Sequence, residues 1–151
     1  MKILKRHRAA IPRPTSRVDG WEHALLAVIA EYDAKPFAWG TADCLTLVAD
    51  SCMAVTGMDP LLPVRGEYSS AEEASQLMAA RGCADVLGAL GQVFEQCPPA
   101  MARRGDVGVL KHPTLGYAAV VVAGPYVVGR HERGSFKVPL LKMVAAFKVG
   151  R

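Results

Sequence analysis

The spacing of apolar residues changes near the middle of the chain, from a helical period before Gly105 to short strand-like segments after it. Apolar residues three or four positions apart predict helices over about 20–33, 42–56, 70–81 and 84–96. Later, β-branched and aromatic segments separated by glycine, proline or charged turns predict strands over 107–110, 117–123, 126–130, 136–140 and 144–149. Helices followed by strands predict an α+β fold, with N-terminal helices packed on a C-terminal antiparallel sheet.

The expected helix starts carry polar residues that can cap the first backbone N–H groups. Two pairs have the spacing of a capping box, Asp19 with Glu22 and Ser70 with Glu73. In the helix over 42–56 we expect Thr41 to be the N-cap, which places Cys44 at about the third helical position. Gly57 ends the pattern, because glycine readily adopts the left-handed conformation that closes a helix.

Length and composition favour one globular domain preceded by a basic arm. With 151 residues, 51% of them hydrophobic and 21% charged, the chain has the size and apolar content of a single packed domain. We therefore expect an extended arm over 1–18 and one domain over 19–151. No apolar run approaches the roughly 20 residues that cross a bilayer, and no apolar segment follows the N-terminal charges. The sequence thus predicts neither a membrane span nor a signal peptide.

The formal net charge of +4 is concentrated at the two ends of the chain. No basic stripe interleaved with aromatic residues runs through the middle, so we do not expect nucleic-acid binding. The arm carries four arginines, Arg6, Arg8, Arg13 and Arg17. Because guanidinium groups pair with carboxylates in bidentate geometry, we interpret the arm as an assembly element that binds acidic patches on a neighbouring subunit.

The cysteines indicate reduced thiols rather than disulfides or a metal site. Cys44, Cys52, Cys83 and Cys97 include no C-x-x-C pair. Cys52 lies two helical turns after Cys44, which is too far for a disulfide within one helix. We therefore expect neither a metal ion nor another cofactor.

Cys44 is the main candidate for chemistry, because it lies at a predicted helix start. The N–H groups and partial positive charge there favour the thiolate and lower a thiol pKa from its usual value of about 8.5. The same N–H groups can stabilise an oxyanion. Two observations argue against an activated thiol. Buried cysteines are ordinary core residues, and the carboxylate of the adjacent Asp43 raises a thiol pKa. The sequence leaves both interpretations of Cys44 open.

Several short motifs occur in an order that resembles one enzyme family. They are PFAWG at 36–40, DC at 43–44, TGMDP at 56–60 and RGDV at 104–107, between a helix around Trp21 and a β-rich tail. Over residues 19–150 this order resembles the NlpC-type papain-like cell-wall peptidases, and within them a small branch from phage and prophage tail gene clusters. The resemblance implies a papain-like fold, a location in the phage tail, and synthesis in the cytoplasm of a bacterial host.

The resemblance also implies a catalytic set in which Cys44 is the nucleophile and a histidine on the second strand is the general base. Tyr117 occupies the expected place of that histidine, and tyrosine, with a pKa of about 10, is a poor base near neutral pH. His112, in the turn before that strand, and His131, at the end of the next one, are the candidates to replace it. Each histidine also has an interpretation without a catalytic role, because His112 precedes a proline in a turn and His131 lies in a charged hairpin.

We expect the substrate-binding residues to be Trp39, Asp43 and Tyr117. The first hypothesis is a structural tail-tip component that has lost catalysis and binds other tail-tip proteins through its arm. Tyr117 should then face Cys44, with His112 and His131 out of reach. The alternative is an active endopeptidase or amidase that binds peptidoglycan and cleaves its stem peptides during phage entry. A third possibility is a binding module that uses the cleft near Cys44 without chemistry.

Overall fold

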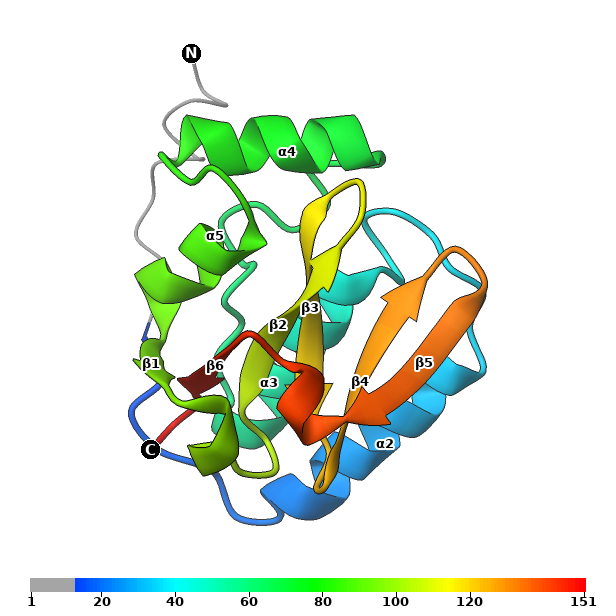
Figure 1. Ribbon diagram of the computed structural model, residues 1–151. Coiled ribbons are helices and arrows are strands. Elements are labelled where there is room, and N and C mark those ends of the chain that lie inside the picture. Colours follow the sequence, from blue (N-terminus) through cyan, green and yellow to red (C-terminus); the bar gives the residue numbers. More distant parts are fainter. Residues whose placement is uncertain (1–12) are drawn as a thin grey trace.

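The computed structural model describes residues 13–151 and has the predicted order of helices before strands (Figure 1). Within these residues the α-helices are α2 (Trp21–Asp33), α3 (Cys44–Thr56), α4 (Ala71–Ala80) and α5 (Val86–Val93). The strands are β1 (Glu95–Cys97), β2 (Val107–His112), β3 (Gly116–Val122), β4 (Tyr126–His131), β5 (Gly134–Pro139) and β6 (Ala145–Lys148). Two short 3-10 helices are η1 (Pro99–Met101) and η2 (Leu140–Lys142). The fold is α+β, as predicted. None of the helices in residues 13–151 is long and apolar enough to cross a membrane.

All six strands form one antiparallel sheet with the order β1-β6-β2-β3-β4-β5. The predicted strands correspond to β2 through β6, but β1 was expected to be helical. The expected helix over 84–96 ends at Val93, and Phe94 already has an extended backbone with φ −123° and ψ 153°. Residues 95–97 then pair with β6. Pairing at this sheet edge satisfies their backbone groups and overrides the local helical spacing.

Helices α2, α3 and α5 pack against the sheet from one side. Helix α3 contacts β3 and β4, α5 contacts β2, β3 and β6, and α2 lies beside α3 and reaches β5 (Figure 1). Side chains of β3 alternate between this core and a smaller cluster on the opposite face, as Val121 and Val120 illustrate. Both valines are fully buried, and each such side chain contributes about 1.5–3 kcal/mol to stability. The central strands are therefore the most stabilised part of the fold.

Two predicted helix starts differ from the structure in their capping. The residue before α2 is Gly20, in the left-handed region at φ 76°, and no side chain caps this helix. The capping box expected to begin at Asp19 is therefore wrong, because the turn at Gly20 places Asp19 outside the N-cap position. Ser70 does cap α4, since its hydroxyl accepts from the Glu73 N–H at 3.1 Å. The Glu73 carboxylate instead accepts from the Ser69 N–H, also at 3.1 Å, one residue earlier than predicted.

The last residues of the expected arm pack against the domain. Arg17 donates to the Asp106 carboxylate at 3.0 Å, and Arg151 from the C-terminal end binds the same carboxylate. Asp106 is fully buried, so the three side chains join both ends of the chain to the turn before β2. Arg17 thus binds its own domain, in contrast to its expected pairing with a neighbouring subunit. The predictions for residues 1–12 lie outside the described residues.

Candidate functional site

The sheet divides into two hairpins that part from each other. Strands β2 and β3 pair along their whole length, and so do β4 and β5. Strands β3 and β4, in contrast, pair only at Val121–Val128 and Val122–Val127. Beyond these pairs the two hairpins diverge (Figure 1). Residues of both hairpins and Cys44 of α3 line one cleft.

Asp43, not Thr41, is the N-cap of α3. The Asp43 carboxylate accepts from the Thr46 N–H at 2.8 Å, and the Thr46 hydroxyl accepts from the Asp43 N–H at 2.9 Å. This reciprocal capping box fixes the start of the helix. Cys44 is consequently the first helical residue, rather than about the third as predicted. The helix ends at Gly57, with φ 78°, as predicted.

The hydrogen bonds of the Asp43 carboxylate hold the loop before Cys44 as well as the start of the helix. It is fully buried and accepts two further hydrogen bonds, from the Gly40 N–H at 2.7 Å and the Tyr68 hydroxyl at 2.8 Å. Glycine is required at position 40, because a Cβ there would lie 2.2 Å from the Tyr68 carbonyl oxygen. Asp43 points into the protein and is not among the residues lining the cleft, in contrast to its expected role in substrate binding.

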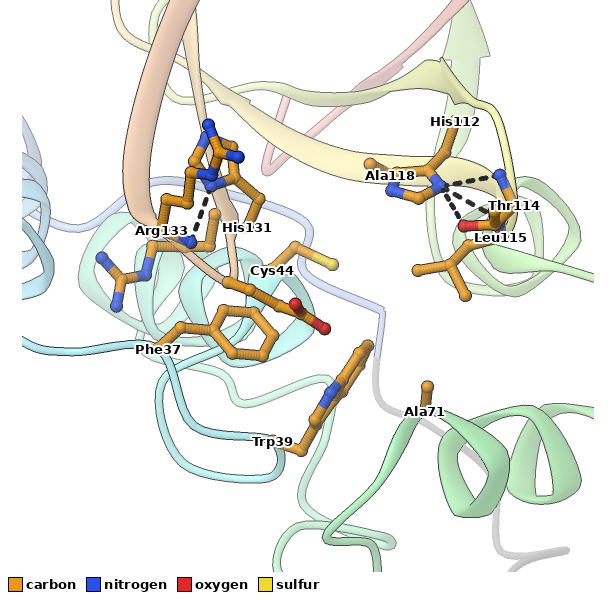
Figure 2. Close-up of a pocket in the computed structure, with 12 residues that line it drawn as sticks. Phe37, Trp39, Cys44, Ala71, His112, Thr114, Leu115, Ala118, His131 and Arg133 are labelled. Atoms are coloured by element: carbon orange, nitrogen blue, oxygen red, sulfur yellow. Dashed lines mark hydrogen bonds between the residues drawn. The ribbon is translucent and has the colours of Figure 1, made fainter.

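A cleft of about 530 Å³, which we call the thiol cleft, opens over Cys44 (Figure 2). Figure 2 shows His112, from the end of β2, and His131, from the end of β4, on opposite sides of it. Trp39 also lines the cleft. A second pocket of about 180 Å³ shares Cys44 and Trp39 and includes Tyr117. Of the predicted site residues, Cys44, His112, His131 and Trp39 thus line the thiol cleft, and Tyr117 lines the adjoining pocket.

The Cys44 thiol is held in its protonated form. The residue is 8% exposed, and burial together with the adjacent Asp43 carboxylate raises the thiol pKa from 9.0 to about 11. The backbone N–H groups of Cys44 and Leu45, at the helix start, and of Ala119, in β3, lower the pKa, but burial has the larger effect. The pKa therefore moves upward, against the prediction from the helix position alone.

Both histidines use one ring nitrogen as an acceptor within their own turns. His112 Nδ1 accepts from the Leu115 N–H at 3.0 Å and the Thr114 N–H at 3.2 Å. His131 Nδ1 accepts from the Arg133 N–H at 3.0 Å. A neutral imidazole has one acceptor and one donor nitrogen, so the proton of each neutral ring is on Nε2. Nε2 is then a hydrogen-bond donor rather than a base.

The thiol lacks an imidazole partner within the described part of the chain. Among hydrogen bonds between residues 13–151, none joins Cys44 to His112 or His131. Tyr117, at the start of β3, lines the adjoining pocket together with Cys44. Cys44 thus shares one pocket with Tyr117 and another with both histidines.

Arg130 is a buried cation beside the site that the sequence analysis missed. It is 3% exposed and lines the thiol cleft. Its guanidinium donates to the carbonyl oxygens of Tyr32 at 2.8 Å, Lys35 at 2.7 Å and Ala42 at 3.3 Å. Carbonyl oxygens at the C-terminal end of α2 carry partial negative charge, which compensates the buried cation. Only the charged sequence around position 130 hinted at this role, and it is equally typical of an exposed hairpin.

The polar side chains lining the thiol cleft are mainly hydrogen-bond donors. They include two imidazoles, the Arg133 guanidinium and one neutral thiol. Residues 13–151 contain no group of three or more His, Cys, Asp or Glu side chains placed to hold a metal ion.

Comparison with known proteins matches the chain to a family of unknown function. No curated protein matches the chain. The model of one protein family, described as a domain of unknown function (DUF6950), matches residues 16–149. The match includes the cap of α3, both hairpins and every residue lining the thiol cleft. The chain therefore belongs to the DUF6950 family.

Proposed function

We propose that the protein is a structural component of a phage tail tip, built on a papain-like domain of the NlpC type whose cysteine site is catalytically inactive. The proposal starts from the order of motifs at 36–40, 43–44, 56–60 and 104–107, which resembles that family. A cysteine that begins a helix packed on an antiparallel sheet is consistent with it. In this proposal the chain is made in the host cytoplasm and assembles with other tail-tip proteins into the virion.

The hydrogen bonding of the two imidazoles carries the inactive assignment. A general base must accept the thiol proton, but Nδ1 of each ring already accepts from backbone N–H groups and Nε2 holds a proton. If the proton moved to Nδ1, it would point at the N–H of Leu115 or Arg133. The hydrogen bond from that N–H would be lost, at a cost of about 1–3 kcal/mol. The thiol adds a second obstacle, because a pKa of about 11 leaves about one molecule in ten thousand ionised at pH 7.

One observation favours the second candidate, an active amidase or endopeptidase that cleaves peptidoglycan stem peptides. The thiol cleft holds a thiol and two imidazoles in one opening, with backbone N–H groups of Cys44 and Leu45 beside the sulfur. Such N–H groups can stabilise an oxyanion. Catalysis would require His112 or His131 to leave its turn and present an unprotonated nitrogen to the sulfur.

Peptidoglycan digestion separates the two candidates. Purified wild-type protein and Cys44→Ala are incubated with peptidoglycan, and soluble stem-peptide fragments are measured by mass spectrometry. We expect no release by either protein. Release by the wild type that is lost in Cys44→Ala, with an unchanged melting temperature, would establish the active enzyme instead. Alkylation with iodoacetamide gives an independent result, because the inactive site predicts a reaction midpoint well above the usual thiol value of about 8.5.

Assembly tests the structural part of the proposal. Deleting residues 2–12 retains Arg17 and its bond to Asp106, so the domain is expected to keep its melting temperature. Incorporation of this variant into tail particles, measured by immunoblotting of purified virions, is expected to be lost. Normal incorporation would contradict an assembly role for the arm.

A further inference from the structure

The thiol cleft presents more hydrogen-bond donors and positive charge than acceptors. His112 and His131 line opposite walls, and the Nε2–H groups of their neutral rings are not used within their own turns, while the His131 ring also stacks on Phe136. Arg133 adds a guanidinium from the turn between β4 and β5. Arg130 adds a buried positive charge, although most of its N–H groups already bind other residues. Glu132 is the single carboxylate among the residues lining the cleft. The same hydrogen bonds that exclude the histidines as bases thus equip the cleft to bind an anionic acceptor.

Most of the charged side chains lie at one end of the opening, on the hairpin of β4 and β5. Phe37 and Trp39 form one side of the cleft, with their rings edge to face at 5.2 Å between centroids (Figure 2). Past Trp39, the adjoining pocket of about 180 Å³ is lined largely by apolar side chains, including Leu45, Met78 and Val86. A ligand with a carboxylate at the hairpin end and an apolar group at the α4–α5 end would match both parts.

Backbone groups at the start of β3 favour an extended peptide over a small anion. The Ala123 N–H donates to the Tyr126 carbonyl, so alternate residues of β3, including Tyr117, direct their N–H and C=O groups toward β4. Because β4 pairs only with the C-terminal end of β3, the backbone groups of Tyr117 face the opening without a strand partner among the described residues. A strand edge of this kind can hydrogen-bond an extended peptide.

We propose that the thiol cleft is the docking site for an extended segment of a partner protein that carries a carboxylate side chain beside an apolar one. The carboxylate binds between His131 and Arg133, and the apolar side chain enters the pocket lined by Leu45, Met78 and Val86. The segment crosses Trp39 and pairs with the free edge of β3 at Tyr117. The inference rests on the proposed function, because a cleft that does not cleave peptides can hold one in an assembled particle.

Synthetic peptides test the charge and the direction of the segment. The probes are short amidated Gly/Ser peptides that contain Leu-Ala-Glu or Glu-Ala-Leu, and matched peptides with Gln in place of Glu. Binding to the full chain is measured by tryptophan fluorescence, with Trp39→Phe to identify the signal from the cleft. One of the two Glu peptides is expected to bind about tenfold more tightly than its Gln counterpart, as for loss of a charge-assisted hydrogen bond.

Variants of the hairpin should shift this affinity in opposite directions. Arg133→Gln keeps the backbone N–H that binds His131 but removes the guanidinium, so the Glu peptide is expected to bind about fivefold to tenfold more weakly. Glu132→Gln removes the opposing carboxylate and is expected to strengthen binding by about twofold to fivefold. Lys142→Gln is the matched control, because it removes an exposed cation from η2, outside the cleft. Each variant is checked for an unchanged melting temperature.

Three outcomes would overturn the inference. The first is equal affinity for the Glu and Gln peptides or no binding of either, and the second is a response of Lys142→Gln equal to that of Arg133→Gln. The third is tighter binding of a soluble peptidoglycan stem peptide than of any probe peptide, which would identify the cell wall as the ligand. A different result, the Cys44-dependent release of peptidoglycan fragments, would overturn the proposed function. The peptide-binding assays and the digestion assay therefore test the two proposals separately.

Discussion

Replacing Asp43 with alanine is expected to lower the free energy of unfolding by about 3–8 kcal/mol. The carboxylate is fully buried and accepts hydrogen bonds from the Thr46 N–H, the Gly40 N–H and the Tyr68 hydroxyl. Loss of an N-cap costs about 0.5–2 kcal/mol. Each of the other two donors loses its acceptor inside the protein, at about 1–3 kcal/mol. The sum is a large fraction of the about 5–15 kcal/mol that stabilises a typical domain.

Urea unfolding at pH 7, followed by tryptophan fluorescence, measures this effect. Tyr68→Phe is the matched control, because it removes one of the three donors and leaves the cap intact, for an expected loss of about 1.5–3 kcal/mol. The reasoning would be refuted if Asp43→Ala lost less than about 1 kcal/mol or no more than Tyr68→Phe. A second readout is independent of stability. Asp43→Asn removes a charge that raises the Cys44 pKa, so the alkylation midpoint of the folded protein should move to lower pH.

Three further predictions follow from buried contacts. The free energy of unfolding should fall as the pH rises from about 9 to 11, because the Cys44 thiol pKa is raised to about 11 in the folded state, and Cys44→Ala should flatten this fall in urea titrations. Gly40→Ala should cost about 2–4 kcal/mol, since its Cβ would lie 2.2 Å from the Tyr68 carbonyl oxygen at φ 86°, and a melting temperature near that of the wild type would contradict this. Asp106→Asn should cost about 2–4 kcal/mol because Arg17 loses a buried carboxylate, with Arg17→Ala in the same unfolding assay showing a smaller loss.

The local spacing of apolar residues and the turn residues between segments were sufficient to predict most helices and strands. The helix over 44–56 could be predicted because apolar residues recur every three or four positions and Gly57 ends it in the left-handed conformation. Its cap could not be assigned as easily, since Thr41 and Asp43 are both good N-cap residues. The decisive feature is Thr46, three residues after Asp43, whose hydroxyl completes the capping box in place of the usual Glu or Gln.

The properties of the site depend on contacts between segments far apart in the chain. The thiol pKa is set by burial against β3, which reverses the effect expected from the helix start. The tautomers of His112 and His131 depend on turns that the sequence only marks as polar. Arg130 binds carbonyl oxygens almost a hundred residues earlier in the chain, so no local pattern could identify it as buried.

Arg130 has a further consequence for how the thiol cleft can respond to an occupant. Its bonds to Tyr32, Lys35 and Ala42 join the end of β4 to the loop that carries Phe37 and Trp39 in a single unit. The hairpin wall and the aromatic wall can separate only if a buried guanidinium gives up its carbonyl oxygens. This side of the cleft is therefore preorganised, and its hairpin wall and aromatic wall keep a fixed separation. Adjustment to larger or smaller occupants falls to the facing turn at 112–116, where the bonds of His112 stay within the turn itself.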